Sequence, residues 1–278
     1  MLLFLGSENK NKYYIKKNMW TDLNKRLKSF APISLSQLNA SASFLDRIDT
    51  KYLMTEDQFE QILTDLEEDF FILEINDRSI FEYESIYMDT EKYGFYNQHQ
   101  NREKSRTKVR TRLYVDSQLA FFEFKQKQNG ITRKFRYQFS PELHGKMWAE
   151  STKFFEGVYQ SMYGKMPEKI LPSIITKYSR LTFCSKTNDE RVTVDFNIRV
   201  LDARNPKTEE LPFKNLVILE SKSASKKGKS HKVMKKNKVK EASSCSKYSL
   251  GLIYHKKIKE TSVFDKTIKK LEKIAAKS

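Results

Sequence analysis

Charged and apolar residues alternate along short segments of this chain, and this alternation constrains its fold most strongly. In the segment 108–114, Lys108, Arg110 and Arg112 alternate with Val, Thr and Leu. Successive side chains of a β-strand point to opposite faces, so the three cations would project from one face. Like charges on one face of a sheet repel one another unless an anion lies among them. The segment therefore predicts a β-strand whose charged face binds a polyanion.

Eight segments have the composition of β-strands, and most connections between them are short enough for antiparallel pairing. The predicted strands are 47–54, 82–90, 107–116, 119–128, 131–140, 174–184, 190–201 and 214–223. The sequence Gln128-Asn129-Gly130 fits a tight turn between two of them. A barrel of eight strands has an interior that just fits side chains or one slim ligand. We therefore predict an α+β fold, an eight-stranded antiparallel β-barrel with helices packed outside.

Helical patterns lie before and between the predicted strands. Residues 13–30 carry apolar residues at helical spacing, and a short helix is expected at 34–38. Thr55 and Gln58 form a capping box, and the helix that follows has a clear apolar face. The apolar residues of that face are Phe59, Ile62, Leu63 and Leu66. A further helical stretch is predicted at 141–162.

The chain shows no internal repeat, and its two ends differ from its centre. We expect an N-terminal helical extension at 1–34, a central domain at 35–255, and a basic amphipathic helix at 256–278 that packs on the same domain. The apolar face of that last helix is Phe264, Ile268, Leu271 and Ala275. Its alternative is to lie on a membrane surface. Residues 222–240 carry nine lysines and no acid, which predicts a polyanion-binding segment or a solvated loop.

The charge balance restricts the class of partner. The chain contains 52 Lys and Arg against 35 Asp and Glu, a net charge of +17, which favours nucleic acid, an anionic membrane surface or a phosphate-rich substrate. Two cysteines, Cys184 and Cys245, give no disulfide framework and no metal-ligand spacing, so a reducing compartment is expected. No apolar run approaches the ~18–20 residues that a membrane span needs, and the start lacks a signal-peptide pattern. We therefore expect a cytoplasmic protein.

The charged strand faces hold twelve cations and four carboxylates. The cations are Arg47, Lys51, Lys108, Arg110, Arg112, Lys125, Lys127, Lys134, Arg136, Arg180, Arg191 and Lys222, and the carboxylates are Asp49, Glu123, Asp195 and Glu220. Strand 190–201 extends this face to Asn197. A sheet face in water is most favourable when positive and negative charges are mixed. The excess of cations therefore favours a curled sheet around a charged lumen over a flat sheet with its charged face in water. Arginine grips phosphate bidentately, and carboxylates in such a lumen would hold Mg²⁺ or Mn²⁺ or orient a cation.

Nine short motifs also occur in one order along the chain. They are Arg-Ile-Asp-Thr-Lys-Tyr (47–52), Tyr-Met-Asp-Thr (87–90), Phe-Tyr-Asn-Gln-His (95–99), Lys-Val-Arg-Thr-Arg-Leu-Tyr (108–114), Phe-Glu-Phe-Lys (122–125), Tyr-Ser-Arg (178–180), Arg-Val-Thr-Val-Asp (191–195), Leu-Glu-Ser-Lys (219–222) and Ser-Lys-Tyr (246–248). In this order they resemble the catalytic domain of the vacuolar transporter chaperone (VTC) family and its bacterial relatives, within the triphosphate tunnel metalloenzymes. The resemblance spans about residues 35–250.

The resemblance implies an eight-stranded tunnel in which ATP γ-phosphates are polymerised into polyphosphate. Matched motif by motif, the catalytic residues that grip phosphates are Lys51, Arg110, Arg112, Lys125, Arg180, Arg191 and Lys247, and the further substrate-binding residues are Lys134, Arg136 and Tyr178. Glu220 is expected to hold Mn²⁺ or Mg²⁺, while Glu123 is either a second metal ligand or the partner of a neighbouring arginine. The segment after Lys222 departs from the family pattern, so Lys247 is identified only by Ser-Lys-Tyr.

Three functions stay open. The leading hypothesis is a metal-dependent polyphosphate polymerase that binds ATP and polyphosphate, with a membrane-protein partner as a further option. A triphosphatase of the same superfamily ranks second, because strand 47–54 lacks the glutamate pair typical of those enzymes. A non-catalytic polyanion-binding module ranks last, and nucleic acid is disfavoured, because only Tyr114 and Tyr178 provide aromatic rings on the charged faces. His99 is interpreted as a structural hydrogen-bonding residue rather than a catalytic base.

Overall fold

Eight long strands form one curled sheet in this computed structural model, which describes residues 23–40, 48–187, 189–205 and 207–277. Their order across the sheet is β2-β11-β9-β8-β4-β5-β6-β7. They are β2 (Ile48–Met54), β4 (Phe81–Thr90), β5 (Ser105–Tyr114), β6 (Leu119–Gln128), β7 (Ile131–Phe139), β8 (Ile170–Ser185), β9 (Glu190–Asp202) and β11 (Val217–Ser223). Each corresponds to one predicted strand. Two short strands pair alongside the long ones, β3 (Phe70–Leu73) with β8 and β10 (Leu211–Pro212) with β9. A third, β1 (Pro32–Ile33), pairs with β3.

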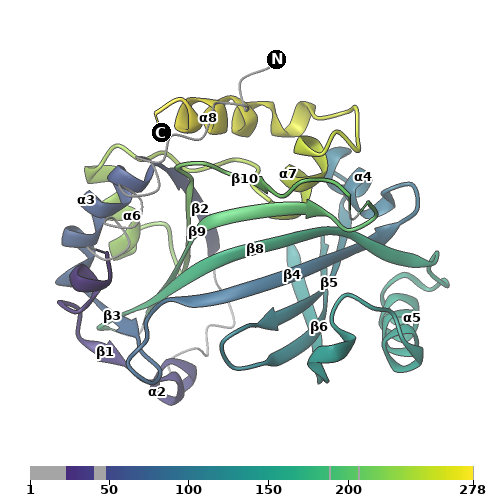
Figure 1. The fold of residues 1–278 in the computed structure, drawn as a ribbon, viewed down its shortest axis with the longest axis horizontal. Coiled ribbons are helices and arrows are strands. Elements are labelled where there is room, and N and C mark those ends of the chain that lie inside the picture. The colour runs from purple at the N-terminus through teal and green to yellow at the C-terminus, as the bar shows by residue number, and fades with distance from the viewer. Residues whose placement is uncertain (1–22, 41–47, 188, 206, 278) are drawn as a thin grey trace.

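The sheet bends around its own axis without closing (Figure 1). Neighbouring long strands are all antiparallel, but β2 and β7, the first and last of them, do not pair with each other within the described ranges. The predicted α+β class, with eight antiparallel strands and helices outside, is confirmed in the form of a half-barrel. Exposed Arg133, Lys134 and Arg136 line β7, and charges on an edge strand oppose pairing with a further strand.

Helix α3 (Glu56–Glu67) packs on the convex side of the half-barrel. Its start is the predicted capping box, because Thr55 Oγ1 accepts from Gln58 N and Gln58 Oε1 accepts from Thr55 N, each at 3.1 Å. The predicted apolar face is buried against Phe183, Val192 and Val194 of β8 and β9. Leu23, Leu27 and Phe30 join the same cluster. They belong to the predicted helix 13–30, of which residues 13–22, with Trp20, lie outside the described residues.

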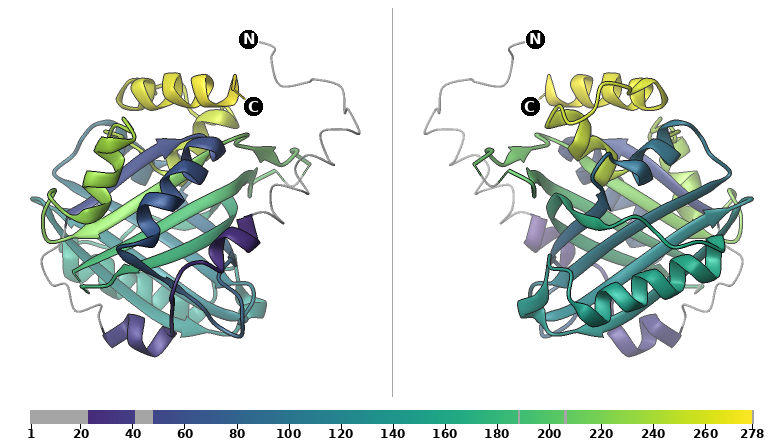
Figure 2. Two further views of the ribbon diagram at one scale, coloured as in Figure 1. Left: turned by 90° about the vertical axis from the view of Figure 1, so that its left-hand side faces the viewer. Right: turned by 90° about the vertical axis from the view of Figure 1, so that its right-hand side faces the viewer.

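Helix α5 (Ala149–Tyr163) covers the outer face of β6 and β7 (Figure 2). Its Phe155 packs in one cluster with Phe122 and Phe124 of β6. The predicted helix at 141–162 is divided in the structure, because a 3₁₀ turn at Pro141–Leu143 ends before Gly145, which has a φ of 78°. Glycine adopts this left-handed conformation without the penalty that a Cβ imposes.

Part of the lysine run forms helix α6 (Lys229–Lys236), where the sequence left open a polyanion-binding segment or a solvated loop. Val233 and Met234 are buried in the cluster beneath α3. Lys236 pairs with Asp65 of α3 at 2.7 Å. Two buried apolar residues are too few to give a periodic pattern, so this lysine-rich helix could not be predicted from apolar periodicity.

The C-terminal helix α8 (Asp265–Ala275) crosses the upper end of the half-barrel (Figure 1). Leu271 and Ile274 are buried in a cluster with Leu53 and Ile218 from β2 and β11. Of the predicted apolar face, Phe264 and Leu271 are buried, and Ile268 and Ala275 are half-buried. Among the described helices, none is both long and apolar enough to cross a membrane.

Candidate active site

Cations and carboxylates from neighbouring strands meet on the concave face of the half-barrel. The strand register places Arg110 of β5 opposite Glu123 of β6, and Arg180 of β8 opposite Asp195 of β9. It also places Lys51 of β2 opposite Glu220 of β11. Opposite charges at paired positions stabilise a sheet. The charged faces predicted from alternation are thus organised around three carboxylates, each on a different pair of strands.

Glu123 is the centre of the first cluster, the Glu123 cluster, which contains Glu123, Arg110 and Lys134. Arg110 Nε donates to Glu123 Oε2 at 2.6 Å, and Lys134 Nζ lies 2.5 Å from Oε1. Glu123 is 2% exposed. Burial would raise the pKa of this carboxyl, but Arg110, Arg112 and Lys134 outweigh burial and hold the pKa well below its usual range. Because cations contact both oxygens and the carboxylate is buried, the geometry favours a cation-holding role for Glu123 over a metal ligand.

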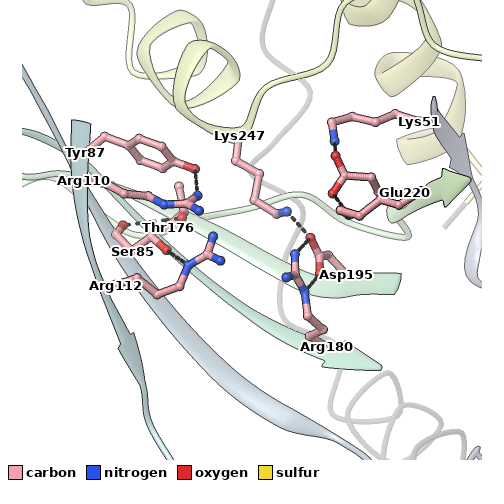
Figure 3. A network of polar contacts seen from close by, with 11 residues as sticks. Lys51, Ser85, Tyr87, Arg110, Arg112, Thr176, Arg180, Asp195, Glu220 and Lys247 are labelled. Atoms are coloured by element: carbon pink, nitrogen blue, oxygen red, sulfur yellow. Dashed lines mark hydrogen bonds and ion pairs between the residues drawn. The ribbon is translucent and has the colours of Figure 1, made fainter. Parts of the chain in front are cut away.

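Neutral partners orient the two arginines of β5 (Figure 3). Arg110 Nη1 donates to the hydroxyl of Tyr87 at 3.2 Å, and Arg112 Nε donates to Ser85 Oγ at 3.2 Å. Both partners lie on β4, which pairs with β5. A guanidinium has five N–H groups in a rigid fork, so each arginine keeps the capacity to donate to a phosphate while β4 holds it in position.

The second cluster, the Asp195 cluster, consists of Asp195, Arg180 and Lys247. Arg180 donates bidentately to Asp195, with Nε at 2.5 Å from Oδ1 and Nη2 at 2.8 Å from Oδ2. Lys247 Nζ also donates to Oδ2 from the opposite side (Figure 3). Burial would raise the pKa of Asp195, but Arg180 and Lys247 hold it well below its usual range. Two cations share one buried carboxylate, so the cluster has a net positive charge.

Tyr178 lies beside the Asp195 cluster and is buried. Lys247 Nζ is 4.3 Å and Arg180 Cζ is 5.3 Å from the centre of its ring, which are cation–π distances. Burial would raise the pKa of Tyr178, but Arg112, Arg180 and Lys247 outweigh burial and lower it. Tyr178 therefore orients cations through its ring, in addition to its predicted contact with substrate.

Lys247 owes its position to helix α7 (Lys247–Tyr254), which no sequence pattern predicted. The hydroxyl of Tyr248 donates to the buried carboxylate of Asp89 at the end of β4. Asp89 also accepts from the backbone N–H groups of Phe95 and Tyr96, at 2.8 and 3.0 Å, in helix α4 (Gly94–Gln100). One buried carboxylate thus ties α7 to α4 and fixes where Lys247 enters the half-barrel.

The third cluster, the Glu220 cluster, contains Glu220, Lys51 and Lys222. Glu220 Oε1 pairs with Lys51 and Oε2 with Lys222. Burial, with the nearby charge of Lys222, lowers the pKa of Lys51 well below its usual value. A cavity of about 290 Å³ opens here, and its lining includes Lys51, Glu220 and the exposed Lys125 of β6. The structure thus brings three predicted site residues around one cavity.

Lys108 of β5 was assigned to the charged face but not to the predicted site. Its Nζ donates to Ser246 Oγ, the N-cap of α7, at 3.0 Å. Burial, with repulsion from Lys125 and Arg110, lowers the pKa of Lys108 to about 7. A half-buried lysine with this environment gains free energy from a bound anion. Lys108 lies two residues before Arg110 and therefore on the same face of the strand. This spacing is the sequence signal that could have placed Lys108 among the predicted site residues.

His99 of α4 lies near the same lysine. Burial, with repulsion from Lys108 and Arg106, lowers the pKa of His99 to about 2. The imidazole is therefore neutral at physiological pH and too weak a base to accept a proton readily. The interpretation of His99 as a structural hydrogen-bonding residue remains a prediction.

Two predicted phosphate-binding residues have other surroundings. Arg136 is exposed on β7, and its Cζ lies 4.9 Å from the centre of the Phe121 ring. Arg191 of β9 donates from Nη2 to the carbonyl of Leu38 in helix α2 (Leu35–Ala40), the helix predicted at 34–38. The strand register places Arg136 opposite Glu123 and Arg191 opposite Lys222, so each of the two arginines borders one of the clusters. Arg47, predicted on the first strand, lies outside the described residues.

The carboxylates determine how a divalent cation could be held. Among the described residues, no group of three or more His, Cys, Asp or Glu side chains has the arrangement of a metal site. Mg²⁺ often uses one or two protein carboxylates and completes its shell with water and substrate phosphates. Glu220, which lines the cavity, fits this single-ligand arrangement. Cations contact both oxygens of each carboxylate, but Glu123 fits the arrangement less well because it is 2% exposed, whereas Glu220 lines a cavity.

Comparisons with known proteins yield one family and several distant structures. The VTC domain family matches residues 46–255. No curated protein matches the chain. A putative adenylyl cyclase from Hippeastrum, described as having a dominant triphosphatase activity, is 11% identical with a TM-score of 0.48, covering 75% of this chain and 96% of its own. A putative adenylate cyclase from Bacillus halodurans is 11% identical with a TM-score of 0.44, covering 72% of this chain and 94% of its own.

Proposed function

Because this chain belongs to the VTC domain family, we propose that it is a polyphosphate polymerase that transfers the γ-phosphate of ATP to a polyphosphate chain held in the half-barrel. The observation that carries the proposal is the composition of the three clusters. Each places two cations on one carboxylate, as Arg110 and Lys134 do on Glu123. A phosphate chain along the concave face would balance the remaining positive charge of all three clusters.

The reaction needs little general-base catalysis. A terminal phosphate oxygen of the polyphosphate chain is already ionised, so it can attack the γ-phosphorus without losing a proton. The bond between the γ-phosphorus and the β,γ-bridging oxygen breaks, ADP leaves with that electron pair, and a new P–O–P bond forms. Catalysis is then positioning and charge neutralisation, which fits a site rich in arginine and lysine with a neutral His99.

Specific roles follow from the contacts. Arg110, Arg112 and Arg180 are held in fixed orientations, so they suit the gripping of phosphate oxygens around the reacting group. Lys51 and Lys125 line the cavity beside Glu220 and suit the neighbouring phosphates. A divalent cation, Mn²⁺ or Mg²⁺, would neutralise phosphate charge when bound, with Glu220 as its protein ligand. Roles for Arg136, Arg191 and Lys247 in substrate binding remain predictions.

Triphosphate hydrolysis is the alternative, because the same cations could hold a triphosphate while water attacks it. Strand β2 carries Asp49 and Lys51 but no glutamate pair, so it offers fewer carboxylates to bind metal and activate water. A non-catalytic polyanion-binding module is the third candidate. The cytoplasmic location, a membrane-protein partner and the exclusion of nucleic acid remain predictions.

The test uses purified protein with ATP and Mn²⁺ or Mg²⁺, and the products are separated on a polyacrylamide gel stained for polyphosphate. Removal of one transition-state donor commonly lowers a rate by about 100-fold or more, so the double variant Lys51→Ala, Arg112→Ala should yield no visible ladder. A charge-matched control is Arg133→Ala, Lys153→Ala, two exposed residues that contact none of the three clusters.

A ladder from the wild type and the control, without a ladder from the double variant, is the expected result. Orthophosphate without a ladder would instead make the protein a triphosphatase. Tight polyphosphate binding without either product would leave a binding module.

A further inference from the structure

A second cavity, the lysine pocket, lies beside the half-barrel site and has a volume of about 550 Å³. Its lining is Leu53, Gln58, Lys238, Val239, Lys240, Glu241, Ala242, Ser243, Lys266, Thr267 and Lys270. The end of the lysine run and the C-terminal helix α8 therefore meet in one place. These two basic segments are far apart in the sequence, and the polymerase mechanism proposed above uses neither.

The pocket concentrates positive charge. Among the described residues, four lysines line it with a single acid, Glu241, which is already paired with Lys226 at 2.7 Å. Lys270 is half-buried and donates to the carbonyl of Lys240 at 3.3 Å, and burial lowers its pKa. Lys238, Lys240 and Lys266 are exposed, so their ammonium groups can contact an anion that enters the cavity.

The lysine pocket shares a wall with the cavity of the Glu220 cluster. Residues 241–243 line both cavities. This wall is fixed on β2, because the N–H of Ala242 donates to the carbonyl of Lys51 at 2.8 Å. Lys51, which lines the first cavity, and Leu53, which lines the second, point from the same face of β2 and are separated by about 7 Å along the strand. The two cavities therefore lie next to each other, on either side of residues 241–243.

The chemistry of the lining indicates which anion fits. Within the part of the chain that the structure describes, the lining contains no aromatic ring on which a base could stack, and no arginine fork that would select a single oriented phosphate. Lysines bind as point charges on flexible stems, which suits successive phosphates of a linear chain in more than one register. A nucleotide or nucleic acid is therefore a poorer match than a phosphate chain without bases.

We propose that the lysine pocket is a second binding site for the polyphosphate chain whose reacting end lies in the half-barrel. This inference rests on the proposed function. A chain that occupies both cavities binds through two linked contacts, so its second contact forms at a high effective concentration. The pocket thereby retains long chains between rounds of transfer, while ligands too short to span the shared wall gain nothing from it.

The test is isothermal titration of the full chain, without ATP or metal, with tripolyphosphate and with polyphosphate long enough to span both cavities. The pocket variant is Lys266→Gln, Lys270→Gln. Its control is Lys269→Gln, Lys273→Gln, which removes the same charge from the same helix at two exposed positions outside both cavities. We expect the pocket variant to weaken long-chain binding about tenfold and tripolyphosphate binding less than about twofold, with the control close to wild type.

The failures of the two proposals are distinguishable. An equal long-chain affinity in the pocket variant and the control, while Arg112→Ala still abolishes tripolyphosphate binding, would overturn the pocket and leave the half-barrel site standing. Tripolyphosphate binding that is absent, or that does not depend on Arg112, would overturn the proposed function and the pocket with it. An equal loss in the pocket variant and the control would assign the effect to the charge of α8 as a whole and would also overturn the pocket.

Discussion

The two faces of β9 are built on opposite principles, although both are buried. On the convex face, Val192 and Val194 pack in the apolar cluster beneath α3 and are fully shielded from water. On the concave face, Asp195 is 4% exposed and holds Arg180 and Lys247. Apolar burial on the first face stabilises the fold, whereas confinement of charges on the second carries a desolvation cost. The comparison teaches that the convex face of β9 stabilises the fold, whereas its concave face holds the charges that the proposed function assigns to phosphate binding.

The same division separates the two faces of β6. Phe122 and Phe124 pack beneath α5, while Glu123 between them binds Arg110 and Lys134 on the other side. One-residue alternation thus places a stabilising surface and a binding surface on the same strand. If this interpretation is right, substitutions on the two faces should have separable effects on stability and on anion binding.

The largest effect is expected from Asp195→Ala. Removal of one partner from a buried ion pair leaves unpaired charge and commonly costs about 3–5 kcal/mol, so the free energy of unfolding should fall by that amount. Tripolyphosphate should restore part of the loss, because an anion can replace the carboxylate between Arg180 and Lys247. Chemical denaturation with and without tripolyphosphate measures both. A stability loss that the anion does not reduce would break the link between this cluster and ligand binding.

A somewhat smaller loss of stability is expected from Leu63→Ala on the convex side. Leu63 of α3 is fully buried, and a buried Leu→Ala change costs about 2–5 kcal/mol. Leu63 packs in the convex cluster and not on the charged concave face. Tripolyphosphate affinity, measured by calorimetry below the unfolding transition, should therefore stay within about twofold of the wild type, far from the tenfold that about 1.4 kcal/mol would produce. A tenfold weaker affinity would mean that the two faces are coupled.

The smallest effect, with the opposite sign, is expected from Lys108→Met. The pKa of Lys108 is about 7 in the folded protein and ~10.4 in an unfolded chain, so the unfolded chain binds the proton between these values and the folded protein does not. The contribution of Lys108 to the free energy of unfolding therefore rises as the pH increases from 7 to 10, and it is least favourable below 7. Removing this cation should raise the melting temperature at pH 6.5 by about 2–4 °C.

The same variant should weaken tripolyphosphate binding about tenfold, the change that 1.4 kcal/mol produces. At pH 8 the wild type should take up a proton when the anion binds, because the anion favours the charged form of Lys108. Titration in buffers of different ionisation enthalpy measures that uptake. Lys153→Met, at an exposed position on α5, is the control and should change none of these quantities. Unchanged proton uptake in Lys108→Met would contradict the assignment.

Several features of the site could not be predicted from sequence patterns. A β-bulge interrupts the pairing of β8 and β9 near Tyr178, and Asn197 there has a φ of 50° and is exposed. Strict alternation assigns Asn197 to the charged face, because it has no means of detecting an extra residue. The position of Lys247 likewise depends on contacts of α7 with Asp89, which lies 158 residues earlier in the chain.

The sequence by itself determined the eight strands, the alternation of charged and apolar faces along most of them, and the capped helix on the convex side. These features depend on local spacing, because a strand repeats every two residues and a helix every 3.6. Only the tertiary structure decided that β2 and β7 stay unpaired in the described ranges, which carboxylate holds which cations, and that two basic segments form one pocket. Those outcomes depend on strand register and on helix docking between distant residues, and no local pattern encodes either.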